Sequence, residues 1–339
     1  MALTGGWYWA SAGDREVLSK LVGLDQAALE VSIKTLSIME DAPLFSIAEA
    51  GGIISRPDAF TALRGVLTAG DVERFVEVAF DVLSLPDPAI DLPPDQRWYA
   101  NVVGKDRPHS GRLRTNLADS LAFLAAASEG LVGGPAARWA VERLVHRLFQ
   151  VEDPSIWFHT RDVLPALAEA APDAFMRALE RDLDREADDV GVWRLLKPVE
   201  GTSGENLRAG LLWGLERIAW SPDRFGHVAT ILAGLCARAL SDNWVNKPAS
   251  TLAMLFHPLL PQTGADEALQ MRVLEAIFRR YGANRRGMRS TLQPAQRMET
   301  LPQRFSFRVT LRWLFSASLR ESVACSHIER LPSRNLSDS

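Results

Sequence analysis

The residues best suited to chemistry lie in one short basic stretch of the chain. It contains five side chains that carry or can carry positive charge: Lys105, Arg107, His109, Arg112 and Arg114. Ser110 lies among them, where it can cap a helix that begins near Arg112. A helix N-terminus surrounded by cations attracts anions, so this stretch predicts a phosphate or carboxylate site. The alternative is that these cations pair with aspartates and glutamates of the chain itself.

A second candidate site is a set of three tryptophans near one another in the sequence. They are Trp213, Trp220 and Trp244, accompanied by the polar residues Asn243, Asn246 and Gln262. Tryptophan is enriched at the energetic centres of protein interfaces. It also fills gaps between packed helices, where its ring N–H bonds a loop carbonyl. The set therefore indicates either contacts with a partner or core packing, and packing is the more common use.

Familiar motifs of catalysis and cofactor binding are missing from the sequence. The only Gly-Lys pair, Gly104-Lys105, lacks the earlier glycine and the following Ser or Thr of a phosphate-binding P-loop. The six histidines occur singly, without the spacing of a metal site, and no Gly-x-Ser-x-Gly elbow occurs. We therefore predict no catalytic residue, no metal and no cofactor. The alternative is an enzyme or nucleotide-binding protein whose site residues are dispersed along the chain.

The elements that must position these residues are predicted to be helices. In Val72–Leu83 apolar residues recur every three or four positions, which lines one face of an α-helix, and residues 211–218 and 225–236 repeat the pattern. Thr68 and Asp71 have the spacing of residues that cap a helix N-terminus. Alternating β-branched runs bounded by turn signals are hard to find. We therefore expect little or no β-structure.

The fold class predicted from these patterns is all-α. Helices of about 10 to 18 residues joined by short loops favour an irregular α-solenoid or stacked antiparallel helix pairs of the HEAT type. The helical-repeat domain is predicted to cover residues 1–280, with a candidate sub-boundary near residues 201–206. Residues 281–339 are basic, rich in Arg and Ser and free of Lys, and are predicted to be partly disordered.

The overall composition predicts a chain that buries a large core in water. Its 339 residues are 47% hydrophobic, and its formal net charge of −4 gives no reason to expect nucleic acid, except through the basic residues 281–339. The apolar stretches are far shorter than the roughly 20 residues that cross a bilayer, so no membrane contact is expected. Two distant cysteines and the lack of a signal peptide indicate the cytoplasm.

Five segments of the sequence together resemble a known family. They are Ile54–Ala59, Asp71–Leu83 leading to Asp87-Pro88, His109–Arg114, Leu164–Phe175 and Leu211–Trp220. These segments resemble the helical region downstream of the ATPase module in bacterial STAND-type NTPases, a class that includes antiviral sensors, and the similarity covers residues 7–263. In that class the helical repeats sense a ligand, often a foreign protein. The resemblance implies a ligand-sensing part without its ATPase module.

These observations lead to one functional prediction. We expect a non-enzymatic helical-repeat module for recognition or scaffolding, which binds a protein partner through a concave face. The basic stretch and the three tryptophans are the expected contacts. The oligomeric state and the identity of the partner do not follow from the residues.

Overall fold

The computed structural model describes residues 1–131, 134–150, 152–185, 190–197, 206–236, 240, 244–257 and 263–281. These residues form two compact units. The first unit contains residues 1–219 and 240–246. The second unit consists of two segments, which begin at Trp220 and at Lys247. Residues 201–205 of the sub-boundary that the sequence predicts, and residues 282–339 of the predicted C-terminal segment, lie outside the described part of the chain.

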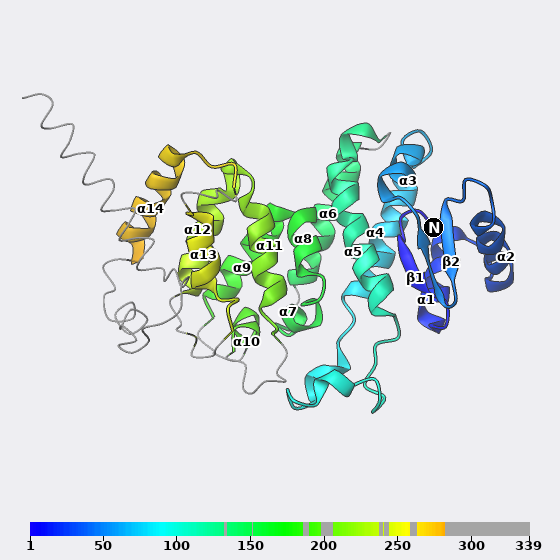
Figure 1. Cartoon of the computed structure of the whole chain (residues 1–339), viewed down its shortest axis with the longest axis horizontal. Helices are drawn as coiled ribbons and strands as arrows, with labels where there is room; N and C mark the ends of the chain where they lie inside the picture. Colours follow the sequence, from blue (N-terminus) through cyan, green and yellow to red (C-terminus); the bar gives the residue numbers. More distant parts are fainter. Residues whose placement is uncertain are drawn as a thin grey trace, which may run out of the picture. The chain divides into compact units, whose positions relative to one another are not determined.

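Helices dominate the described chain (Figure 1). In the first unit they are α1 (Ala12–Val22), α2 (Gln26–Ser37), α3 (Arg56–Leu63), α4 (Ala69–Leu83), α5 (Gly111–Ala126), α6 (Gly134–Phe149), α7 (Ile156–His159), α8 (Leu164–Ala170), α9 (Pro172–Leu183), α10 (Val192–Leu195) and α11 (Ala209–Ala219). The second unit contains α12 (Pro222–Leu235), α13 (Pro248–Leu255) and α14 (Glu267–Tyr281). The predicted α-helical character is confirmed, and Thr68 and Asp71 form the expected capping box of α4.

One small sheet accompanies the helices, so the described chain is mostly helical with little β-structure. Strands β1 (Gly6–Tyr8), β2 (Leu44–Ile47) and β3 (Ala50–Ile53) pair antiparallel in the order β1-β3-β2. Trp7 of β1 lies against Gly51 of β3, where an added Cβ would lie 2.4 Å from the indole nitrogen. The strands are three or four residues long, and β1 and β3 contain glycines, so they show no alternating pattern that sequence inspection detects.

The first unit continues from α4 as two rows of helices. Helix α8 packs against both α5 and α11 in one row, and α6 packs against both α4 and α9 in the other. Consecutive helices also contact each other across the rows, α5 with α6 and α8 with α9. Among the described helices, none has the length and apolar character that crossing a bilayer requires.

The contact between α8 and α11 depends on glycines spaced four residues apart in α11. A Cβ added at Gly210 would lie 2.4 Å from the carbonyl oxygen of Arg161, and one at Gly214 would lie 3.0 Å from the Cβ of Ala168. Glycine therefore allows the backbones to approach closely, because any larger residue at Gly210 meets a backbone oxygen.

Replacing Gly210 by alanine is expected to destabilise the first unit. Overpacking costs about 1–3 kcal/mol, which exceeds the gain of up to about 1 kcal/mol that alanine brings to a helix. Gly70 is the matched control, since it is also the second residue of its helix and the nearest atom to an added Cβ is 3.8 Å away. Urea unfolding should show lower stability for Gly210→Ala than for Gly70→Ala. Equal stabilities would contradict the close approach.

Candidate functional site

A long connector between α4 and α5 projects from the helices of the first unit (Figure 1). We call its residues 85–109 the finger, which includes the 3-10 turns η1 (Pro88–Asp91) and η2 (Arg97–Tyr99). Its tip exposes three large apolar side chains: Trp98 is 76% exposed, Val102 79% and Val103 50%. The finger thus presents an indole ring and two valines to water.

Ion pairs tie the outgoing arm of the finger to its return arm. Asp91 on the outgoing arm lies 3.2 Å from the Nζ of Lys105 on the return arm. Closer to the helices, Asp87 lies 3.1 Å from a guanidinium nitrogen of Arg107. The outer pair is exposed and contributes at most about 1 kcal/mol, whereas the inner pair is almost buried. Together the pairs keep the arms side by side.

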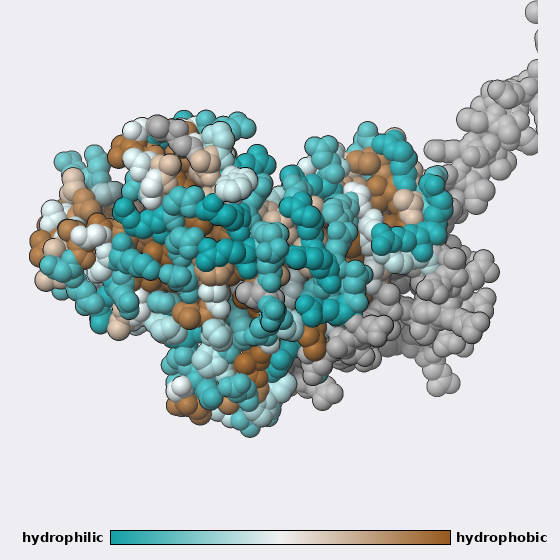
Figure 2. Space-filling model, turned by 180° about the vertical axis from the view of Figure 1, so that it is seen from behind, coloured by the Kyte–Doolittle hydropathy of each residue, from teal (hydrophilic) through white to brown (hydrophobic). Residues whose placement is uncertain are grey.

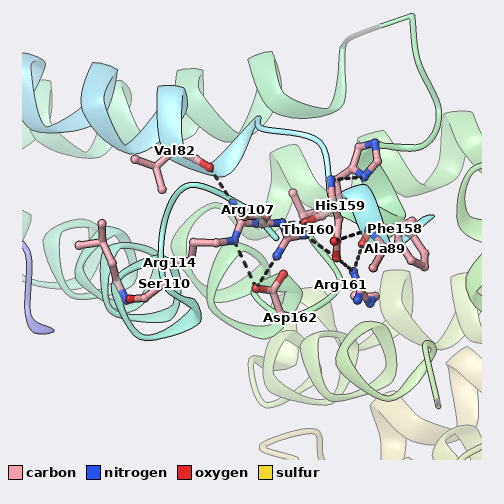
Figure 3. Close-up of polar contacts among 12 residues, drawn as sticks. Val82, Ala89, Arg107, Ser110, Arg114, Phe158, His159, Thr160, Arg161 and Asp162 are labelled. Atoms are coloured by element: carbon pink, nitrogen blue, oxygen red, sulfur yellow. Dashed lines mark hydrogen bonds and ion pairs between the residues drawn. The ribbon is translucent and has the colours of Figure 1, made fainter. Parts of the chain in front are cut away.

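Charged side chains gather where the finger meets the helices (Figure 3). We call this set the base cluster: Asp87, Arg107, Arg114, Arg161 and Asp162. Arg161 donates to Asp87 Oδ2 at 2.6 Å. Arg107 and Arg114 each lie 3.4 Å from Asp162 Oδ2. The cluster therefore joins the finger to α5 and to the segment between α7 and α8.

Backbone carbonyls complete the contacts of two arginines in the base cluster. Arg114, which is 1% exposed, donates to the carbonyl of Val82 at 2.6 Å and to that of His159 at 3.0 Å. Arg107 also donates to the His159 carbonyl, at 2.5 Å. One side chain of α5 thus binds the C-terminal end of α4 and the end of α7. The cluster is a structural joint between elements distant in sequence.

The electrostatics of the base cluster follow from burial and from crowding of like charges. Burial and the nearby charge of Arg114 lower the pKa of Arg107, against the opposite effects of Asp162 and Asp87, and the net result is a pKa of about 10. Burial raises the pKa of Asp87, but the hydrogen bond from Arg161 and the charges of Arg161 and Arg107 outweigh it, so this pKa lies below its usual value. The Asp87 carboxylate is therefore held in its charged form.

The N-terminus of α5 binds a carboxylate of the chain itself. Ser110 caps the helix by accepting from the backbone N–H of Leu113 at 3.1 Å. The N–H of Ser110 donates to Asp14 Oδ1 at 2.8 Å, and its hydroxyl donates to Asp14 Oδ2 at 2.5 Å. Asp14 is fully buried. The position at which the sequence predicts an external anion thus holds Asp14.

The remaining residues of the basic stretch point to different partners. Lys105 pairs with Asp91, as described above. Arg112 donates to the carbonyl of Gly51 at 3.2 Å and stacks over the ring of Phe45. His109 lies beside Gly13, and burial lowers its pKa. Of the five predicted basic residues, Arg107 and Arg114 share one carboxylate, that of Asp162.

The three predicted tryptophans lie at the surface. Trp213 is 52% exposed, Trp220 67% and Trp244 38%. Trp213 and Trp244 belong to the first unit and Trp220 to the second. Their indole rings are therefore not core residues. Of the polar residues near them in sequence, Asn243 and Gln262 lie outside the described part of the chain.

Sequence reasoning missed the apolar tip of the finger. Trp98, Val102 and Val103 lie in a connector without helical periodicity, so they match no template for a core or a site. A usable signal was present, because an indole and two valines in a long connector rich in Pro and Asp have no helix face to occupy. Loops of this length are often functional.

His159 makes the stability of the finger's base depend on pH. The residue is 5% exposed, and its Nδ1 accepts a hydrogen bond from the backbone N–H of Asp87 at 3.0 Å. Burial lowers its pKa below the usual 6.5; nearby Arg107 and Arg161 lower it further, against the opposite effects of Asp153 and Asp87. The folded state therefore resists protonation that the unfolded chain accepts.

The free energy of unfolding should consequently fall as the pH drops below about 6.5, because His159 of the unfolded chain then binds a proton while His159 of the folded chain does not. The fall ends at the lowered pKa of the folded state, where His159 is protonated in both states. Replacing His159 by glutamine, whose amide oxygen can accept from Asp87, should flatten this slope in urea unfolding between about pH 7 and about pH 5. His146→Gln, at an exposed site of α6, is the control. If His159→Gln showed the same dependence of unfolding free energy on pH as the original chain, His159 would not be the source of that dependence.

Comparisons with known proteins identify no relative: no protein-family model, no curated protein and no solved structure matches this chain. Among the described residues, no group of three or more His, Cys, Asp or Glu side chains is arranged to hold a metal ion. The candidate site therefore consists of an exposed apolar tip, two arms joined by ion pairs and a buried charged base.

Proposed function

We propose that this chain is a non-enzymatic helical module for recognition or scaffolding, and that it binds a protein partner. The observation that supports this function is the finger, which holds Trp98, Val102 and Val103 in water. Burying side chains of this kind in a partner would contribute about 1.5–3 kcal/mol each. Tryptophan is also one of the residue types enriched among interface residues that dominate binding energy.

The support beneath the tip favours binding over a merely connecting role. Arg97 stacks on Phe158 with its guanidinium carbon 4.9 Å from the ring centre, and it donates to the carbonyl of Leu92 at 3.2 Å. With the two ion pairs and the base cluster, these contacts order the finger before it meets a partner. Ordering an interface side chain only on binding costs about 0.5–1.5 kcal/mol, so a pre-ordered finger binds more tightly.

The rows of paired helices suit the same function. We propose that they form a HEAT-like solenoid whose concave face adds contacts, with Trp213 on α11 as one exposed anchor. The resemblance of the sequence to the helical region of bacterial STAND-type NTPases supports a role as the ligand-sensing part of a cytoplasmic defence protein. In that role the finger would contact the sensed protein.

Site-specific photo-crosslinking tests the proposed function. A photoreactive amino acid replaces Val102 in one variant and Ile38, which is 83% exposed, in a control variant. In the cells that produce the chain, we expect a discrete protein adduct from position 102 that position 38 does not give. Adding Trp98→Ala should remove the adduct while changing stability by less than about 0.5 kcal/mol, because the side chain is exposed. Identical adducts at both positions, or none at position 102, would refute the function.

A further inference from the structure

We infer that the partner of the finger is a protein with an apolar pocket whose rim carries lysine or arginine side chains. This inference rests on the proposed function and specifies its partner. It is based on the charged side chains of the finger that have no ion-pair partner among the described residues. Figure 2 shows the surface on which it depends, with hydrophobic residues of the finger at the lower end of the view, bordered by hydrophilic ones.

Most charged side chains of the finger are engaged within the chain. Asp87 binds Arg107 and Arg161. Asp91 binds Lys105. Arg97 stacks on Phe158, as described above. The aspartates and their partners largely neutralise one another, and Arg97 is directed toward α7, so these side chains add little net charge at the tip.

Two carboxylates remain beside the tip. Asp95 lies three residues before Trp98, and Asp106 lies three residues after Val103. Both residues are exposed, and within the described part of the chain neither makes a salt bridge. The apolar tip is therefore flanked on both arms by uncompensated negative charge.

This charge pattern selects among classes of partner. Nucleic acids and anionic lipid surfaces present phosphates, which two flanking carboxylates repel. A protein pocket with a basic rim attracts the same carboxylates, which accelerates association and sets the orientation of the tip. The apolar insertion supplies most of the affinity, and the rim charges supply selectivity. An apolar pocket with a basic rim matches both features of the finger.

The test uses the full chain and the protein captured at position 102. Dissociation constants are measured by calorimetry for the original chain, for Asp95→Lys with Asp106→Lys, and for Glu40→Lys with Asp41→Lys. The second pair is the matched control, because it changes the net charge equally at exposed residues outside the finger. Co-sedimentation with vesicles of phosphatidylserine and phosphatidylcholine runs in parallel for the same three proteins.

We expect the reversal on the finger to weaken binding at least about 10-fold. Added salt should then strengthen binding of the reversed variant and weaken binding of the original chain, because each attraction becomes a repulsion. The control reversal should stay within about 2-fold, a range typical of charges outside an interface. The inference of a basic rim would be overturned if the reversal on the finger left binding unchanged or made it tighter. It would also be overturned if the original chain co-sedimented with the anionic vesicles. A captured protein that binds Trp98→Ala as tightly as the original chain would instead overturn the proposed function.

Discussion

Replacing Asp14 by asparagine is expected to lower the free energy of unfolding of the first unit by about 2–4 kcal/mol. One carboxyl oxygen accepts from the N–H of Tyr8 at 2.8 Å and the other from the N–H of Ser110 at 2.8 Å. An amide has only one acceptor oxygen, so its NH2 group would face one of these donors. Asp14 is fully buried, and water cannot replace the lost bond.

The control for this prediction is the same exchange at another helix N-terminus. Asp25 caps α2 by accepting only from the N–H of Ala28, and it is exposed. Asparagine caps helices about as well as aspartate, so Asp25→Asn should change stability by less than about 0.5 kcal/mol. Denaturant unfolding monitored by circular dichroism compares the two variants. Similar small effects at both positions would show that Asp14 does not hold β1 against α5.

Replacing Arg114 by methionine should lower the free energy of unfolding by about 3–5 kcal/mol, because it removes one partner of a buried charged pair and leaves the other partner in place. Methionine keeps much of the aliphatic stem but leaves the carbonyl of Val82 without its donor. Asp162 would also lose one of its two arginine neighbours. The finger should loosen along with the joint, which hydrogen exchange of residues 85–109 detects as faster exchange.

Arg138→Met provides the comparison for Arg114. Arg138 lies on α6, its side chain is 55% exposed, and its nearest acidic partner, Glu142, is 3.8 Å away. An exposed pair of this kind contributes at most about 0.5 kcal/mol. If Arg114→Met were as mild as Arg138→Met, or left exchange in the finger unchanged, the base cluster would not support the finger.

Much of the helical structure could be predicted because its causes are local. The stripe from Val72 to Leu83 needs only a partner surface, and the Thr68 and Asp71 cap acts within one turn. The pairing of β1 with β3 could not be predicted, because it joins segments about 45 residues apart and depends on the close approach of Trp7 to Gly51. Local sequence patterns do not indicate contacts between segments distant in sequence.

The candidate site was predictable only in part, for the same reason. The basic stretch is visible in the sequence, and so is the alternative that it binds the chain's own acids. Which acids these are depends on long-range folding, since Asp14 is 96 residues from Ser110 and Asp162 is 48 residues from Arg114. The exposure of Trp213 likewise depends on which side of α11 packs against α8.

By itself, the sequence determined the helical class, the helix starts and the position of the basic stretch, because capping, periodicity and charge are properties of neighbouring residues. The tertiary structure alone decided that Arg107 and Arg114 are engaged by Asp87 and Asp162, and that Trp98 remains exposed at the end of the finger. Burial and ion pairing are properties of the packed chain. They arise only when segments distant in sequence are brought together, and so does the surface that we propose for recognition.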